Sequence, residues 1–191
     1  MQKKILVINA HPYDESYVSE LFRTYVNHLD TNKHQVKTIE LGKMTFDPVL
    51  RYGYTKRMPV DNDIELSQNL VSWADHIVFF YPIWWTTMPA LLKGWIDRVI
   101  TPGFAFNSQG FKTTKHLKGR TAQLFMTSDA PALYQRLILN SPVRLMKRHI
   151  LGYCGIKVVK SDIFGIVTSA KRERARKRFI EKVKESAINF K

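Results

Sequence analysis

The 191-residue sequence has a single cysteine, Cys154, so no disulfide can form within the chain, and the count argues against a cysteine-based zinc site. Long apolar runs are also missing, because the longest, Ile77 to Trp85, is too short to span a membrane and contains Pro82. The first residues show no small-residue cleavage site, so we expect no secretory signal and a cytoplasmic protein. The six histidines are dispersed without metal-ligand spacing, and we expect no metal site.

Acidic residues are scarce in the second half of the chain. Residues 98–161 hold 11 basic residues and one acid, Asp129, whereas residues 1–97 hold 10 basic and 11 acidic residues. Residues 162–191 add nine basic and four acidic residues, and the whole chain carries a net charge of +14. A basic half is typical of proteins that bind nucleic acid, membrane surfaces or phosphate-bearing ligands, and the charge alone does not choose among them.

Apolar periodicity predicts strands that alternate with helices. Short β-rich runs predict strands at 5–10, 36–41, 77–81, 121–127 and 156–164. Helical spacing predicts helices over 18–29, 64–74, 87–100 and 170–189, with a long loop at 42–63. This alternation predicts a doubly wound α/β fold with a parallel sheet, helices on both faces and a single domain over residues 1–191.

In a doubly wound sheet, ligands bind beyond the carboxyl ends of the strands, which directs attention to loops 11–17, 82–87 and 127–134. The first loop leads through Ser16 into a helix N-terminus, where backbone amides and the helix dipole favour a phosphate. It lacks the glycine patterns of a Rossmann site and of a P-loop. The alternative is that Ser16 is only a helix cap and His11 only a turn residue.

The second loop contains adjacent tryptophans, Trp84 and Trp85, at the end of the strongest predicted strand. A flat aromatic ligand stacked on them would explain their place in an open loop. The alternative places one ring in the core and the other in a subunit interface. The third loop, residues 127–131, is small and polar, so its amides could meet polar ligand edges or form an ordinary turn.

Two nucleophile classes lack support. No serine stands in a G-x-S-x-G elbow, and Cys154, just ahead of a predicted strand, is expected to be buried rather than reactive.

At these three loops the sequence resembles the NAD(P)H:quinone oxidoreductase family, which includes the NAD(P)H dehydrogenase (quinone) and modulator of drug activity B types. The matching segments are Ala10-His11 with Ser16-Tyr17, residues 80–85, residues 88–99, residues 103–106, residues 127–131 and residues 153–155. The resemblance runs from residue 4 to about residue 180, and its most specific stretch is 80–106. It implies a flavodoxin-like, doubly wound five-stranded parallel sheet with strand order 2-1-3-4-5.

The resemblance also implies a bound flavin, FMN or FAD, and assigns residues to it. The phosphate would lie against Ser16, Tyr17 and Val18, with His11 nearby. The isoalloxazine ring would lie along Pro82, Ile83, Trp84, Trp85 and Thr86, and its pyrimidine end would meet Thr127, Ser128, Asp129 and Ala130. Tyr134 matches the active-site tyrosine of the larger eukaryotic enzymes.

The chain departs from those enzymes at two places. Ser128-Asp129 replaces two glycines, and Asn140 replaces the histidine that partners the tyrosine, so a Tyr134–histidine relay is not available at that spacing.

The function that the resemblance implies is two-electron hydride transfer from NAD(P)H through flavin N5 to a quinone or similar acceptor, with ping-pong kinetics. It also implies a homodimer. The alternative is a regulatory flavin-binding ancillary subunit of a potassium-efflux transporter. A third hypothesis, nucleic-acid binding through residues 98–191, predicts steeply salt-dependent binding to duplex DNA. With phosphate-bearing ligands expected, the +14 charge supports an anionic cofactor, and we expect no nucleic-acid partner and no insertion into a membrane.

Overall fold

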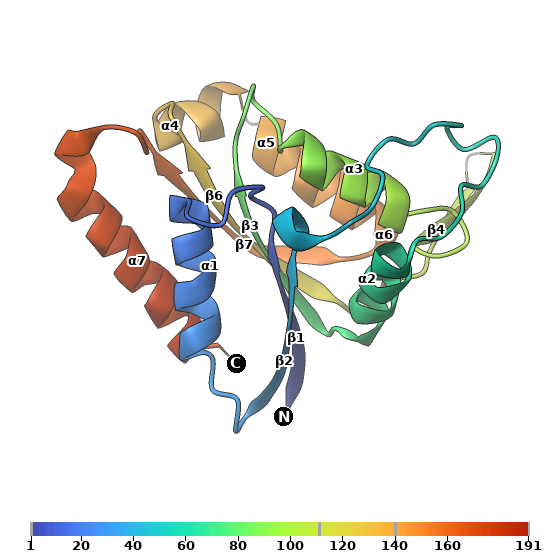
Figure 1. Cartoon of the computed structure of the whole chain (residues 1–191), viewed down its shortest axis with the longest axis horizontal. Helices are drawn as coiled ribbons and strands as arrows, with labels where there is room; N and C mark the ends of the chain where they lie inside the picture. Colours follow the sequence, from blue (N-terminus) through green and yellow to red (C-terminus); the bar gives the residue numbers. More distant parts are fainter. Residues whose placement is uncertain (1, 111, 140, 191) are drawn as a thin grey trace.

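A five-stranded parallel sheet forms the centre of the molecule in the computed structural model, which describes residues 2–110, 112–139 and 141–190 (Figure 1). Its strand order is β2-β1-β3-β6-β7. The strands are β1 (Lys3–Asn9), β2 (His34–Glu40), β3 (His76–Pro82), β6 (Thr121–Ser128) and β7 (Lys157–Gly165). Because β6 and β7 are the fourth and fifth strands of this sheet, the expected flavodoxin-like order 2-1-3-4-5 is confirmed.

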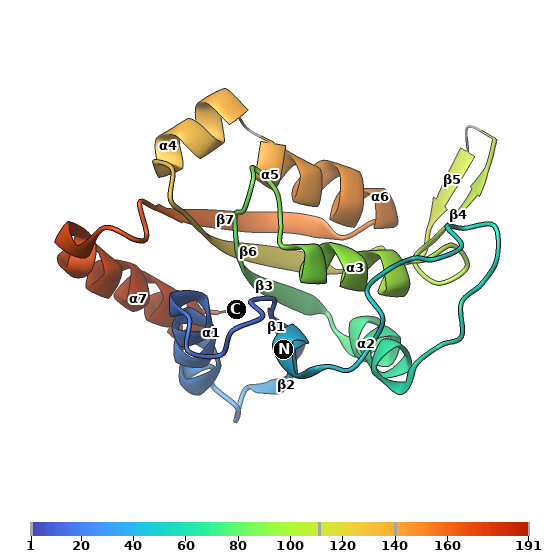
Figure 2. The same ribbon diagram turned by 45° about the horizontal axis from the view of Figure 1, so that its top comes forward.

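Helices cover both faces of the sheet, with α1 and α7 on one face and α2, α3 and the helical stretch before β7 on the other (Figures 1 and 2). The α-helices are α1 (Tyr17–His28), α2 (Asn62–Trp73), α3 (Ala90–Val99), α4 (Ala132–Tyr134), α5 (Ser141–Arg144), α6 (Gly152–Cys154) and α7 (Glu173–Ile188). Short 3-10 turns lie at η1 (Leu41–Lys43) and η4 (Ala170–Arg172), and π-helical segments at η2 (Gln135–Leu139) and η3 (Leu145–Leu151).

Strand β3 shows why the sheet is buried on both faces. Successive side chains of a strand point to opposite faces. Ile77 and Phe79 therefore join the apolar cluster under α2 and α3, whereas Val78 and Phe80 join the cluster under α1 and α7. All seven residues of β3 are buried, as expected for a central strand of a parallel sheet.

Two elements were not predicted from the sequence. One is a two-stranded antiparallel hairpin of β4 (Phe106–Gln109) and β5 (Lys112–Lys115), most of whose residues are exposed, so they leave no apolar pattern. The other is the set of helical segments at 132–139 and 141–154, in which π-helical segments interrupt the usual spacing of 3.6 residues. In addition, α3 begins at Ala90 and not at residue 87 as expected, and Pro89 is its N-cap.

Two further expectations can be compared with the structure. Cys154 is buried, and burial raises the pKa of its thiol to about 11, which leaves it unreactive at neutral pH. Among the described residues, no helix is both long enough and apolar enough to cross a membrane.

Candidate functional site

The three loops singled out from the sequence lie together at the carboxyl ends of β1, β3 and β6. The Ala10 amide donates to the Phe80 carbonyl over 2.8 Å, and the Ile83 amide donates to the Thr127 carbonyl over 2.7 Å. After β1 the chain enters α1 on one face, and after β3 it enters α3 on the other. The loops therefore surround a switch in strand connection, the usual ligand site of such sheets.

The N-terminus of α1 presents backbone amides to this site. Ser16 is the N-cap, and its hydroxyl accepts a hydrogen bond from the Ser19 amide over 3.1 Å. Helix geometry leaves the amides of Tyr17 and Val18 without partners inside the helix, so they can bind an anion. The Val18 side chain is buried in the core, so Val18 can offer only its backbone to a ligand.

The Tyr17 side chain is directed to the terminal helix. Its hydroxyl donates to the Arg176 carbonyl over 3.0 Å, and the Arg176 guanidinium lies 5.9 Å from the centre of its ring. Burial, with the nearby Glu20 charge adding to it, raises the pKa of Tyr17, so the phenol stays neutral. In this arrangement the contribution of Tyr17 to a phosphate site is its backbone amide.

Asn9 and Ser19 hold the first loop in place, and the sequence reasoning missed both. Asn9 Nδ2 donates to Ser19 Oγ over 2.9 Å, and Ser19 Oγ donates to the Tyr13 carbonyl over 3.1 Å. Asn9 Oδ1 also accepts from the His11 amide over 3.2 Å. The signal available in the sequence was a polar residue at the end of an otherwise apolar strand.

His11 lies between the first two loops. Its Nδ1 accepts a hydrogen bond from the Tyr13 amide over 3.0 Å, and its ring meets that of Trp84 edge-on, with 5.4 Å between centroids. Partial burial lowers the pKa of His11, which favours the neutral imidazole. His11 therefore packs against the tryptophan loop, and at neutral pH the first loop offers backbone amides as its anion donors.

The second loop makes a tight turn with an unusual backbone. The amide of Trp84 donates to the Thr87 carbonyl over 2.9 Å, and the Thr87 amide donates back over 3.0 Å. The two central residues, Trp85 and Thr86, have φ angles of 48° and 61°, as in a type I′ turn. Residues other than glycine rarely adopt such φ angles, because each costs about 1–3 kcal/mol of conformational energy. Residues held in such conformations are concentrated at functional sites.

Both tryptophans point outward from this turn. Trp84 is 44% exposed and Trp85 is 96% exposed, so the alternative that one of the rings fills the core is wrong. Pro82 and Ile83, just before the turn, are buried and join the loop to the sheet. The turn thus presents a broad aromatic surface at the opening between the loops.

Side-chain hydrogen bonds fix the third loop. Ser128 Oγ accepts from the Ala130 amide over 3.1 Å and from Gln135 Nε2 over 2.9 Å. Asp129 Oδ1 accepts from the amide and the hydroxyl of Thr168, over 3.1 Å and 2.6 Å. In place of two glycines, this chain therefore has two side chains that tie the loop to its surroundings.

Gln135 and Tyr134 follow the third loop. Gln135 was not predicted; its side chain is buried, and its Oε1 has no hydrogen-bond partner within the described part of the chain. Tyr134, the predicted catalytic residue, lies in α4 and is 42% exposed. Asn140, which stands in place of the family histidine, lies outside the described residues.

The groups at this site suit a bound flavin better than they suit a metal site or a site built around a nucleophilic side chain. Helix amides suit a phosphate, exposed tryptophans suit a flat ring, and loop amides suit polar ring edges. Over residues 2–110, 112–139 and 141–190, no group of three or more His, Cys, Asp or Glu side chains could hold a metal. The site is thus arranged to bind and orient a group that carries the chemistry itself.

Comparisons with known proteins agree with this geometry. A family model described as the flavodoxin-like fold matches residues 3–187. Ribosyldihydronicotinamide dehydrogenase (quinone) of Mus musculus is 31% identical over 198 aligned positions, covering 90% of this chain and 86% of the mouse protein.

Two solved structures have the same fold. A protein from Streptococcus mutans is 31% identical with a TM-score of 0.84, covering 98% of this chain and 100% of the other. An FMN-dependent NADH-azoreductase from Bacillus anthracis, solved in complex with FMN, has a TM-score of 0.72 at 17% identity and covers 97% of each chain. At that identity the second likeness shows the fold alone.

Proposed function

Since the chain belongs to the family of proteins with the flavodoxin-like fold, we propose that it is a flavin-dependent NAD(P)H:quinone oxidoreductase. The observation that carries the proposal is the strained turn from Trp84 to Thr87, which sets Trp84 against His11 in the loop that leads into α1 and leaves Trp85 exposed. A strained turn at a switch point is the form expected of a preorganised ligand site. The name of the mouse relative, a quinone dehydrogenase, supports the same activity.

In this proposal the first loop binds the flavin phosphate. The amides of Tyr17 and Val18 donate to it, and the Ser16 hydroxyl turns from Ser19 toward it, with His11 packed nearby. Residues 98–191 hold 20 basic residues and five acidic ones, and this excess of 15 would raise the local concentration of phosphate-bearing ligands. The cofactor is FMN or FAD, and the electron donor is NADH or NADPH.

The other two loops hold the ring. Pro82, Ile83 and Trp84 form the base of the second loop, and the amides of Trp85 and Thr86 face the polar edge of the flavin. The third-loop residues meet its pyrimidine end; they are Thr127, Ser128, Asp129 and Ala130. Tyr134 lies next along the chain and would donate a hydrogen bond to charge that develops on the ring.

When bound, the flavin accepts a hydride from NAD(P)H and passes two electrons to a quinone or similar acceptor. Donor and acceptor would occupy the aromatic surface at Trp85 in turn, which predicts ping-pong kinetics. We further propose a cytoplasmic homodimer of single-domain chains, with both subunits lining each site. A regulatory subunit of a transporter is not favoured, because the mouse relative is named as a quinone dehydrogenase.

The test begins with the flavin. Acid release from the purified protein followed by chromatography should identify FMN or FAD. Anaerobic mixing with NADH or NADPH should then bleach the bound flavin, and menadione should restore its absorbance. Steady-state rates at several menadione concentrations should give parallel double-reciprocal lines, and sedimentation should give the mass of a dimer.

One result would overturn the proposal. That result is a protein that contains no flavin as isolated and binds none after incubation with FMN or FAD. Intersecting double-reciprocal lines would remove the ping-pong mechanism and leave the flavin assignment in place.

A further inference from the structure

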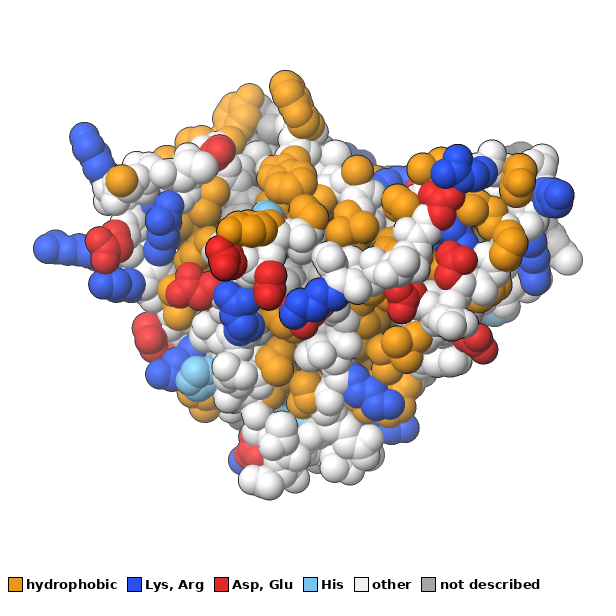
Figure 3. Space-filling view, in the orientation of Figure 1, with side chains coloured by type: hydrophobic (Ala, Val, Ile, Leu, Met, Phe, Trp, Pro, Cys, Tyr) orange, Lys and Arg blue, Asp and Glu red, His pale blue; other side chains and the backbone are white. Residues whose placement is uncertain are grey.

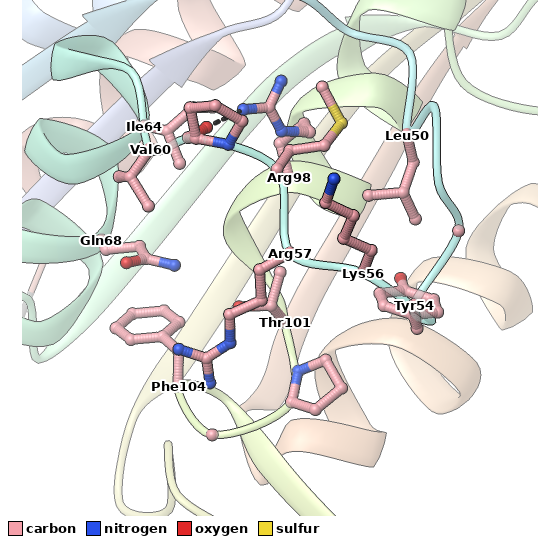
Figure 4. A pocket seen from close by; sticks show the side chains of 15 residues that line it. Leu50, Tyr54, Lys56, Arg57, Val60, Ile64, Gln68, Arg98, Thr101 and Phe104 are labelled. Atoms are coloured by element: carbon pink, nitrogen blue, oxygen red, sulfur yellow. Dashed lines mark hydrogen bonds between the residues drawn. The ribbon is translucent and has the colours of Figure 1, made fainter.

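A cavity of about 380 Å³ lies at the C-terminal end of α3 (Figure 4). It opens between residues 50–60 of the loop before α2 and residues 101–104, which follow α3. The ten residues of α3 separate it from the tryptophan turn, a length of about 15 Å at 1.5 Å per residue. Its volume is in the range of sites that hold one small ligand.

Positive charge dominates the lining of this cavity. Lys56, Arg57 and Arg98 line it, and no carboxylate does so among the described residues. Arg98 is 5% exposed and is held by three acceptors. Its guanidinium donates to the Asp47 carbonyl over 2.6 Å, to the Pro59 carbonyl over 2.9 Å and to Asp61 over 3.1 Å. Arg98 therefore serves to fix the loop.

Arg57 differs from Arg98 because nothing in the described part of the chain forms an ion pair or hydrogen bond with it. Its guanidinium reaches across the cavity to residues 101–104, where a Cβ atom on Gly103 would lie 3.3 Å from Arg57 Nη2. Figure 4 shows it beside Phe104, at the edge of the cavity. A guanidinium in this setting is available to a carboxylate, which it can bind through two parallel hydrogen bonds.

The remaining walls of the cavity are mostly apolar. Tyr54, Val60 and Phe104 flank the space, together with Leu50 and Pro102. Burial raises the pKa of the Tyr54 phenol, with the Asp97 charge acting in the same direction, so the ring remains neutral and does not repel an anion. Two aromatic side chains around an unpaired cation match a ligand with a flat apolar body and one negative end.

We propose that this cavity is a second binding site, which takes a planar aromatic carboxylate with its carboxylate on Arg57 and its ring between Tyr54 and Phe104. The site is distinct from the strand-end loops, and the proposal does not rest on the proposed oxidoreductase activity.

The test uses the purified protein with whatever flavin it carries, and 2-naphthoate as the probe. In two-dimensional NMR spectra, the amide signals of Gly53 and Gly103 should shift on titration. The indole signal of Trp85, at the other end of α3, should not shift at the same concentrations. Uncharged 2-naphthamide, which has the same shape, should bind at least about tenfold more weakly because it cannot form charge-assisted bonds.

Variants on one loop provide the control. Arg57→Gln should weaken naphthoate binding at least about tenfold, and its exposed position predicts an intact fold, which unchanged signals elsewhere would verify. Arg51→Gln removes a charge from the same loop, but Arg51 is paired with Asp47 over 2.6 Å and does not line the cavity. It should bind naphthoate like the parent protein.

Three results would overturn the proposal. They are the absence of shifts at Gly53 and Gly103 up to the solubility limit, equal affinity for naphthoate and naphthamide, and unchanged affinity in Arg57→Gln. Shifts confined to the Trp85 indole are a case of the first result, because they would mean that the probe binds only at the strand-end loops.

Discussion

The two edges of the central sheet are built in different ways. At the carboxyl edge, loops are joined by backbone and side-chain hydrogen bonds, Trp85 is almost fully exposed, and three residues other than glycine, Trp85, Thr86 and Ile166, have positive φ angles. At the amino edge, the rings of His34 and His76 pack on Phe190, with centroids 5.2 Å and 4.7 Å apart, near both chain termini (Figure 1). One edge carries strain and open surface, and the other carries buried rings.

The difference separates residues that serve binding from residues that serve stability. Strain and exposure at the carboxyl edge lower the free energy of unfolding and keep donors and rings available to a ligand. Buried rings at the amino edge raise the free energy of unfolding. Mutations at the two edges should therefore affect stability and flavin affinity in different combinations. Figure 3 shows hydrophobic side chains protruding at the upper edge, over the strand-end loops.

The largest expected effect is a dependence of stability on pH that comes from His76. This side chain is 3% exposed, and burial, aided by the Lys3 charge, lowers its pKa to about 4. The folded protein keeps it neutral, whereas the unfolded chain binds a proton below about pH 6.5. The free energy of unfolding should therefore fall by about 3 kcal/mol from this group as the pH drops from 7 to 4.

Urea titrations at several pH values measure this effect by comparing the parent protein with His76→Asn. The variant should lose less stability between pH 7 and pH 4, because its residue at 76 binds no proton. His116→Asn, which changes an exposed histidine, is the matched control and should follow the parent curve. Parallel curves for parent and His76→Asn would contradict the prediction.

A smaller effect is expected from Asn9, the buried side chain under the first loop. Asn9→Ala removes its bonds to Ser19 and to the His11 amide, which should lower the free energy of unfolding by about 2 kcal/mol. Flavin affinity should fall as well, because the loop that holds the phosphate loses its support. Asn32→Ala, at an exposed turn, should change stability by less than about 0.5 kcal/mol. Denaturant titrations and flavin binding measured on the same samples decide between these outcomes.

The turn at Trp85 should show opposite changes in stability and binding. Trp85→Gly removes an exposed ring and suits the φ of 48°, so the free energy of unfolding should rise by about 0.5–1 kcal/mol. Flavin affinity should fall, because the aromatic surface is lost. Thr87→Gly changes a residue that does not have positive φ, and it should destabilise by about 0.5–1 kcal/mol. Loss of both stability and affinity in Trp85→Gly would show that the turn is not strained.

The sequence predicted the sheet well because its strands are apolar runs with one structural solution. Runs such as Ile77–Tyr81 can be buried on both faces only in the middle of a covered sheet. The β4–β5 hairpin and the helical segments at 132–139 and 141–154 were not predicted, because they lack a regular apolar pattern. Tertiary contacts, not local periodicity, decide such segments.

The site was predictable in place and not in detail. The ends of β1, β3 and β6 indicated where the loops meet, because parallel strands bring their carboxyl ends to one edge. The turn at Trp84–Thr87 could not be read from its residues, since a type I′ turn usually contains asparagine or glycine. The cavity at Arg57 joins loops about 45 residues apart, and nothing in either segment indicates the other.

The smallest expected effect concerns Tyr17, which belongs to the carboxyl edge by its backbone and to the α7 contact by its side chain. Tyr17→Phe removes only the hydroxyl that donates to the Arg176 carbonyl, so stability should fall by no more than about 1 kcal/mol. If Tyr17 holds the flavin phosphate through its amide alone, the affinity for FMN or FAD should stay within about twofold of the parent value, because the amide is unchanged. Tyr25→Phe is the matched control on the same helix; its hydroxyl is buried without a hydrogen-bond partner among the described residues. A tenfold loss of flavin affinity in Tyr17→Phe, with Tyr25→Phe unaffected, would mean that the Tyr17 hydroxyl leaves Arg176 to bind the cofactor, and the two roles of this residue would then not be separate.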